Sequence, residues 1–241
     1  MARSAHTPEL AFDSNLPVGA FFDVDNTLIP GTAIEVHFFR YLLKRGLIGA
    51  GETMRSLWFL LRHIPPFSLH SLRERKLYLA GKQPDAIEPL AHDFIRSKIY
   101  PRLSPDGHAT IEAHRRAGHA LVLLTGSLDF LIAPLAAALK VETVLAARPE
   151  RTPQGYTGHV LPPFPYGEGK RRLVQSFTRQ RNMDLKHCYA YGDSPGDVEV
   201  LQSVGYPMVV NPIRGMARIA RRRGWPIARW KGVKKRKAIA P

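Results

Sequence analysis

The ten residues 20–29, AFFDVDNTLI, constrain the fold more than any other part of this chain. An apolar run over residues 18–22 predicts a short buried strand, and its end carries Asp23, Asp25 and Thr27. Side chains two positions apart on an extended segment point the same way, so Asp23 and Asp25 should face one site. Two neighbouring carboxylates repel each other unless a cation separates them, and oxygen ligands suit Mg²⁺. The alternative is an ordinary Asp/Asn turn after a strand.

Hydrophobic periodicity divides the rest of the chain. The 241 residues allow one domain with a sizeable insertion, or two small domains. Four successive helices without an intervening strand are predicted after the first motif, at about 32–44, 54–63, 68–80 and 85–99. Helices and strands then alternate: helices at 105–117, 130–139, 169–181 and 198–203, and strands at 119–124, 142–147, 186–191 and 207–210, with a hairpin or flap over 155–160.

This alternation predicts an α/β fold with a doubly wound, mostly parallel sheet and an inserted helical-bundle cap. The expected organisation is an N-terminal arm over 1–17, a catalytic core made of 18–31 and 105–230, a cap over 32–104, and a basic tail over 231–241. Ligands of such sheets bind beyond the carboxyl ends of the strands.

Three further motifs lie where predicted strands end or helices begin. Thr125, Gly126 and Ser127 form a hydroxyl-rich turn whose backbone N–H groups can hold phosphate oxygens. Lys170 starts a helix, where the helix dipole disfavours a cation unless an anion lies nearby. Asp193 and Asp197 are separated by Ser-Pro-Gly, a turn that can bring both carboxylates to one place. Taken singly, these motifs are also explained by helix capping and by a solvated lysine.

Together the motifs resemble a known family. FFDVDNTLI, LLTGS, Lys170 and GDSPGD, in this order, resemble the haloacid dehalogenase (HAD) superfamily, whose core is Rossmann-like. The helical insertion after the first motif, together with EGK and YGDS, is similar to its phosphoserine-phosphatase-like branch, subfamily IB. The resemblance covers about residues 18–230.

The resemblance implies roles for the residues of the four motifs. Asp23 would be the nucleophile that forms an aspartyl-phosphate, and Asp25 would be the general acid and then the general base. The implied Mg²⁺ ligands are the Asp23 carboxylate, the Asp25 backbone carbonyl and Asp193. Asp197, Thr27 and Ser127 would support the site. The implied ligands of the substrate phosphate are Thr125, the Gly126 amide and Lys170.

The resemblance specifies the substrate less closely than it specifies the reaction. Thr32 stands where phosphoserine phosphatases resemble one another in having a Glu, and Glu35 follows one helical turn later. The segment SLRER resembles the cap segment of these enzymes that carries an arginine for the substrate carboxylate. Arg73 or Arg75 is therefore a candidate for binding a carboxylate of the substrate. The resemblance implies a phosphoserine-phosphatase-like enzyme for a small phosphomonoester, with histidinol phosphate or a lysophospholipid as alternatives.

Charge and cysteine content bear on partners and location. The net charge is +15, and eleven Lys and Arg but no acidic residue follow Glu199. A basic C-terminal end can bind nucleic acid or anionic lipid, or be a solvated tail without a partner.

The single cysteine, Cys188, favours a reducing compartment. With no predicted signal peptide or membrane span, we expect a cytoplasmic protein. The oligomeric state stays open.

Overall fold

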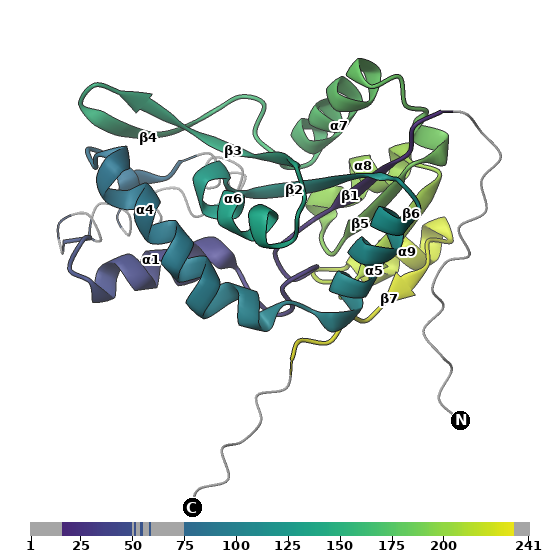
Figure 1. Cartoon of the computed structure of the whole chain (residues 1–241), viewed down its shortest axis with the longest axis horizontal. Helices are drawn as coiled ribbons and strands as arrows, with labels where there is room; N and C mark the ends of the chain where they lie inside the picture. Colours follow the sequence, from purple (N-terminus) through teal and green to yellow (C-terminus); the bar gives the residue numbers. More distant parts are fainter. Residues whose placement is uncertain (1–15, 50, 52–53, 55–57, 59–74, 234–241) are drawn as a thin grey trace, which may run out of the picture.

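A computed structural model describes residues 16–49, 51, 54, 58 and 75–233 (Figure 1). Within them one sheet has the strand order β4-β3-β2-β1-β5-β6-β7. All neighbouring strands pair in parallel except β3 and β4, which form an antiparallel hairpin. The strands are β1 (Gly19–Phe22), β2 (Ala120–Leu128), β3 (Thr143–Thr152), β4 (Gly155–Leu161), β5 (Tyr189–Gly192), β6 (Tyr206–Val210) and β7 (Ile227–Ala228). The predicted mostly parallel α/β fold is confirmed.

Strand β1 lies between β2 and β5 and is buried on both faces, which explains why its sequence is a continuous apolar run. Phe22 belongs to one hydrophobic cluster and stacks on Tyr191 of β5, with ring centroids 4.6 Å apart. Phe21 belongs to a second cluster on the other face, where its ring meets the edge of Phe177. The two clusters hold a helical layer on each face of the sheet.

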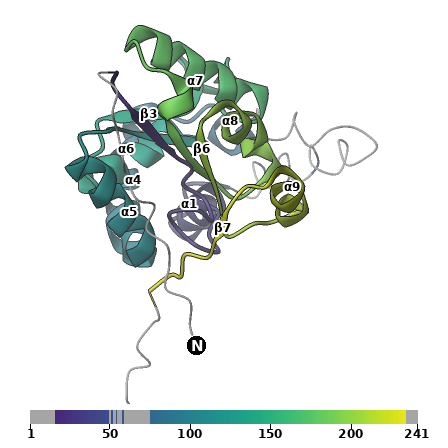
Figure 2. The ribbon, with the colours of Figure 1, turned by 90° about the vertical axis from the view of Figure 1, so that its right-hand side faces the viewer.

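Figure 2 shows these layers, with α4, α5 and α6 on one side of the sheet and α8 and α9 on the other. The first layer contains α4 (Pro84–Phe94), α5 (Pro105–Arg116), α6 (Asp129–Ala138) and also α1 (Ile34–Lys44). The second contains α7 (Glu168–Gln180), α8 (Val198–Ser203) and α9 (Met216–Arg223). No helix in the described part of the chain is long and apolar enough to cross a membrane.

The predicted cap helices are partly described. Helix α1 matches the first, and α4 matches the start of the fourth, which continues as a π-helical turn over Ile95–Ile99 and a 3-10 turn over Tyr100–Arg102. Of the predicted helix over 54–63, only Met54 and Trp58 lie within the described residues.

Residues 75–80 correct the prediction of an α-helix over 68–80, whose earlier part lies outside the described residues. Arg75 forms an antiparallel bridge with His159 of β4, and Leu77–Leu79 is a single 3-10 turn. The reason is pairing with β4: the Lys76 amide donates to the Gly158 carbonyl at 2.7 Å. The segment predicted to be the cap is thereby connected to the β3-β4 hairpin.

The turn predicted at 125–127 is also different in detail. Strand β2 continues through Thr125, Gly126 and Ser127 to Leu128, and α6 begins at Asp129. The pairing of β2 with β3 is irregular between Leu124 and Leu128. The motif is therefore an irregular strand end rather than a turn inside a helix start.

Candidate active site

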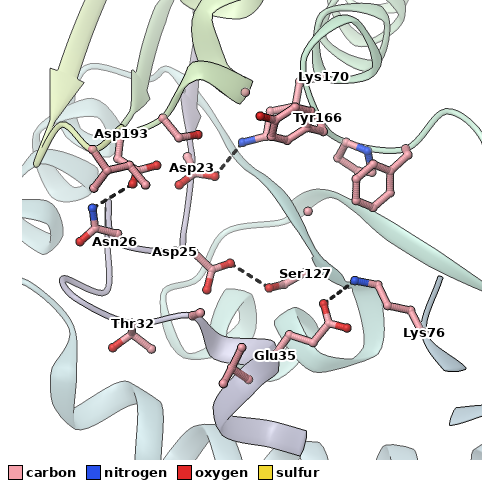
Figure 3. A pocket seen from close by; sticks show the side chains of 18 of the residues that line it. Asp23, Asp25, Asn26, Thr32, Glu35, Lys76, Ser127, Tyr166, Lys170 and Asp193 are labelled. Atoms are coloured by element: carbon pink, nitrogen blue, oxygen red, sulfur yellow. Dashed lines mark hydrogen bonds and ion pairs between the residues drawn. The ribbon is translucent and has the colours of Figure 1, made fainter. Parts of the chain in front are cut away.

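A cavity of about 740 Å³ lies between the carboxyl ends of the central strands and the segment predicted to be a cap, residues 32–104 (Figure 3). Its lining includes residues that follow β1 and β5, the end of β2 and the start of α7. Residues from α1 and from the segment after Arg75 line the cap side. The topology produces this convergence, because neighbouring parallel strands end at the same edge of the sheet.

Asp23 follows β1 directly and is buried. Its backbone amide donates to the Tyr191 carbonyl of β5 at 2.9 Å, which fixes the chain there. The Lys170 ammonium donates to Asp23 Oδ1 at 2.6 Å. Asp23 Oδ2 is buried and has no hydrogen-bond partner among the described residues. Burial raises the pKa of Asp23 well above its usual value, and Lys170 opposes that rise.

Lys170 lies in the first turn of α7, and its side chain is buried. Its ammonium also donates to Asp197 Oδ1 at 2.6 Å. Burial alone would lower the pKa of Lys170, but the charges of Asp197 and Asp23 outweigh it and raise that pKa. The ammonium therefore stays charged. Two carboxylates supply the compensating anion that the sequence predicts for a cation at a helix start.

Asp193 follows β5 and receives a hydrogen bond from Asn26 Nδ2 at 2.8 Å. Burial, together with the charge of Asp197, raises the pKa of Asp193 to about 7. The Asn26 amide also donates to the Asn211 carbonyl at 3.0 Å, so it joins the loops after β1 and β6. Asn26 was not among the predicted site residues; its place within the DVDN motif is the signal that could have identified it.

Asp197 supports the loop between β5 and α8. Its Oδ2 accepts from the backbone amides of Asp193 and Ser194 and from the Ser194 hydroxyl, at 3.2, 3.0 and 2.9 Å. Its Oδ1 is held by Lys170. Both oxygens of Asp197 are thus engaged by the protein itself.

Three carboxylates could hold a metal ion. Asp23, Asp193 and Asp197 each place an oxygen within 4.8 Å of the others, and all three residues are buried. Only oxygen donors are offered, and one of them, Asp23 Oδ2, has no partner among the described residues. This set fits a hard divalent cation such as Mg²⁺.

The Asp25 carboxylate points away from this group, toward α1 and β2 (Figure 3). Its Oδ1 accepts from the Ile34 amide at 2.6 Å, and its Oδ2 accepts from the Ser127 hydroxyl at 2.8 Å. The Thr125 hydroxyl lies 3.4 Å from the same Oδ2. Burial raises the pKa of Asp25, although these hydrogen bonds oppose the rise. Asp25 therefore has a fixed position and an increased tendency to hold a proton.

The remaining predicted residues differ in whether they line the cavity. Gly126, Thr32, Glu35 and Arg75 line the cavity. Thr27 is fully buried, and its hydroxyl has no partner among the described residues. Arg73 lies outside the described residues.

Lys76 and Tyr78 line the cavity beside Glu35 and were not predicted. Both lie in the segment expected to be helical, so no local pattern identifies them. Both side chains bind Glu35 of α1, and the Lys76 backbone amide pairs with Gly158 of β4, so their positions depend on residues distant in sequence.

Comparison with known proteins gives one family. The sequence profile of the haloacid dehalogenase-like hydrolases matches residues 20–202. An inhibition of morphological differentiation protein from Streptomyces azureus is 30% identical over 86% of this chain and 76% of its own length. A histidinol-phosphatase from Neisseria meningitidis is 28% identical over 88% and 98%, and phosphoserine phosphatase SerB1 of Mycobacterium tuberculosis is 28% identical over 88% and 71%.

Solved structures agree on the fold. A Bordetella pertussis protein of unknown function has a TM-score of 0.77 at 27% identity, covering 89% of this chain and 99% of its own. A phosphoserine phosphatase with a phospho-aspartyl intermediate analogue has a TM-score of 0.62 at 16% identity, covering 90% and 95%. The second likeness extends to the fold alone.

Proposed function

The chain belongs to the haloacid dehalogenase-like hydrolases, and we propose that it is a Mg²⁺-dependent phosphatase that hydrolyses a small phosphomonoester through an aspartyl-phosphate. The observation that carries this proposal is the state of the Asp23 carboxylate. Lys170 holds one oxygen, and the other has no partner among the described residues. Such a carboxylate can attack phosphorus when nearby cations neutralise the phosphate charge.

In the first step an Asp23 oxygen attacks phosphorus, and the bond between phosphorus and the ester oxygen breaks. Asp25 gives its proton to that oxygen, so the product leaves as a neutral alcohol. The raised pKa of Asp25, caused first by burial, favours the protonated form that this step needs.

In the second step Asp25, now ionised, takes a proton from water. The water oxygen attacks phosphorus, the bond from phosphorus to the Asp23 oxygen breaks, and inorganic phosphate leaves. The Ile34 amide and the Ser127 hydroxyl hold the Asp25 carboxylate. One position of Asp25 can therefore serve both proton transfers.

The substrate phosphate would be bound by Thr125, the Gly126 amide and Lys170. Asp23, Asp193 and the backbone carbonyl of Asp25 would hold Mg²⁺. A bound Mg²⁺ would neutralise charge on the phosphate oxygens. Support for this ligand set comes from the close carboxylates and from the unpartnered Asp23 Oδ2.

Asp197, whose oxygens hold Lys170 and loop amides, would keep the metal loop in place. Thr27 and Ser127 would complete the support.

The names of two relatives, histidinol-phosphatase and phosphoserine phosphatase, support a small phosphomonoester as the substrate class. A lysophospholipid is a third candidate, suggested by the basic C-terminal end. No comparison supports nucleic-acid or membrane contact, and residues 234–241 lie outside the described part of the chain. The cytoplasmic location stays a prediction.

The test is release of inorganic phosphate from a panel of phosphomonoesters that includes phosphoserine, histidinol phosphate, lysophosphatidate and alkyl phosphates without an amino group. Each ester is assayed with Mg²⁺ and with a chelator. We expect turnover of at least one ester that disappears with the chelator. Absence of turnover of every ester by the folded, Mg²⁺-supplied protein would overturn the proposal.

A further inference from the structure

A second polar cluster lies on the cap side of the cavity and consists of Glu35, Lys76 and Tyr78. Figure 3 shows Glu35 beside Lys76. The Lys76 ammonium lies 2.5 Å from Glu35 Oε2. The Tyr78 hydroxyl donates to Glu35 Oε1 at 3.1 Å. Both oxygens of the Glu35 carboxylate are therefore engaged by the protein before any substrate binds.

The partners of Glu35 are held in fixed positions. Lys76 is only 7% exposed, and its backbone amide is bonded to Gly158 of β4. Burial, and then the charge of Glu35, raise the pKa of Tyr78, which keeps its hydroxyl protonated as a donor. A lysine whose side chain is buried and whose backbone is held in place loses less side-chain freedom on pairing than a mobile surface lysine does. Its ion pair with Glu35 is therefore formed more of the time.

The surroundings of the cluster are largely apolar. Apolar side chains in the cavity lining include Val36, Phe39, Leu77, Phe164 and Ile213. The Lys76 ammonium lies 5.9 Å from the centre of the Phe164 ring. Arg75 and Arg214 also contribute to the lining. Among the described residues that line the cavity, Glu35 is thus the carboxylate on the cap side, and its charge is balanced by Lys76.

We propose that Lys76 is a specificity-determining residue that occupies Glu35 in place of a substrate ammonium. The enzyme would therefore discriminate against phosphomonoesters whose leaving alcohol carries a charged amino group, relative to uncharged alcohols of the same size. This inference rests on the phosphatase function proposed above. A substrate ammonium would meet a carboxylate whose charge Lys76 already neutralises, and displacing Lys76 would leave a buried cation unpaired.

The test compares Lys76→Met with the wild type on matched esters: alkyl phosphates of two to four carbons and ω-aminoalkyl phosphates of the same lengths. The measured quantity is kcat/KM for the amino ester divided by kcat/KM for the uncharged ester. We expect Lys76→Met to raise this ratio about tenfold at one chain length, because a hydrogen bond to a charged group becomes available. The gain should lie in KM, since Glu35 would act by binding.

Three variants separate this effect from general damage. Lys76→Arg keeps a cation beside Glu35, and Lys44→Met removes an exposed positive charge from the far end of α1; both should leave the ratio near the wild-type value. The double variant Lys76→Met with Glu35→Gln should return the ratio to that value, because the freed carboxylate is gone. Circular dichroism melting checks that each variant is folded.

If Lys76→Met does not fold, Glu35→Gln tests the same pair from the other side. It frees the Lys76 ammonium, so the ratio for ω-carboxyalkyl over alkyl phosphates should rise about tenfold. An active wild type whose folded variants leave both ratios unchanged would overturn the inference while the phosphatase proposal stands. A wild type without Mg²⁺-dependent phosphate release would overturn both.

Discussion

The Lys170 ammonium lies 2.6 Å from an oxygen of Asp23 and 2.6 Å from an oxygen of Asp197, so one buried cation joins the loops after β1 and β5. Lys170→Met would leave these buried carboxylates without their cation. We expect the free energy of unfolding, measured by urea denaturation without Mg²⁺, to fall by about 3–5 kcal/mol. Phosphatase turnover should fall about a hundredfold or more, because a charge-stabilising group is lost.

Lys44→Met is the matched control for this change. Lys44 is exposed, so this substitution removes the same charge from the surface instead of from the buried site. Mg²⁺ should restore part of the stability of Lys170→Met, since a divalent cation can neutralise the same carboxylates. An unfolding free energy within about 0.5 kcal/mol of the wild type would contradict a structural role for this ion pair.

Asp23→Asn should separate activity from stability. The amide cannot form the covalent intermediate, so turnover should drop by more than about a thousandfold. The metal-free variant should be at least as stable as the wild type, because the rise in the pKa of Asp23, due first to burial, shows that its ionised form is costly there. Phosphate release and thermal melting measure the two effects. Wild-type activity in this variant would remove Asp23 as the nucleophile.

The sequence predicts the layout of the core because its signals are local. The continuous apolar run over 18–22 is typical of a parallel strand covered on both faces, and β1 is such a strand. The incorrect prediction over residues 75–80 has a non-local cause. Pairing of Lys76 with Gly158 of β4 replaces helical hydrogen bonds there, and hydrophobic spacing carries no information about a partner so distant in sequence.

The residues of the candidate site also divide into those that local motifs identify and those that depend on non-local contacts. Asp23, Lys170 and Asp193 could be selected because each belongs to a recognisable motif at a strand end or a helix start, and the parallel topology brings these positions together. Lys76 belongs to no such motif, and Asn26 shares the DVDN motif with Asp23, but the motif does not indicate its partner. Their importance depends on contacts with Asp193 and Glu35, which only the folded chain creates.

Gly192, the last residue of β5, allows Asp197 to approach the strand. A Cβ at this position would lie 2.5 Å from the Cβ and 2.6 Å from the Cγ of Asp197. Gly192→Ala should therefore displace Asp197 and with it Lys170, lowering kcat at least about tenfold and stability by about 1–3 kcal/mol. Gly118→Ala is the control: its Cβ would meet open space, so only the strain of its positive φ should appear, without loss of kcat. Normal kcat in Gly192→Ala would contradict this tight approach.

We expect His114 to make the stability of the core depend on pH. Its Nε2 lies 2.7 Å from the Tyr191 hydroxyl, and its Nδ1 lies 2.7 Å from Nδ1 of His119. Burial, and then the charge of His119, lower the pKa of His114 to about 3. The unfolded chain, with a histidine pKa of about 6.5, therefore binds a proton more readily than the native protein. Native stability from this group is present above pH 6.5 and is lost as the pH falls from there toward 3.

His114→Phe removes this titration and should flatten the dependence of unfolding free energy on pH. Between pH 6.5 and pH 5 the wild type should lose about 2 kcal/mol more than the variant, because one group contributes about 1.4 kcal/mol per pH unit. The loss of the Tyr191 contact lowers the stability of the variant at every pH and does not change this slope. Urea denaturation at several pH values measures it, and His108→Gln, at a half-buried position of the same helix, should keep the wild-type slope. Parallel curves for the wild type and His114→Phe would show that His114 is not kept neutral by its burial.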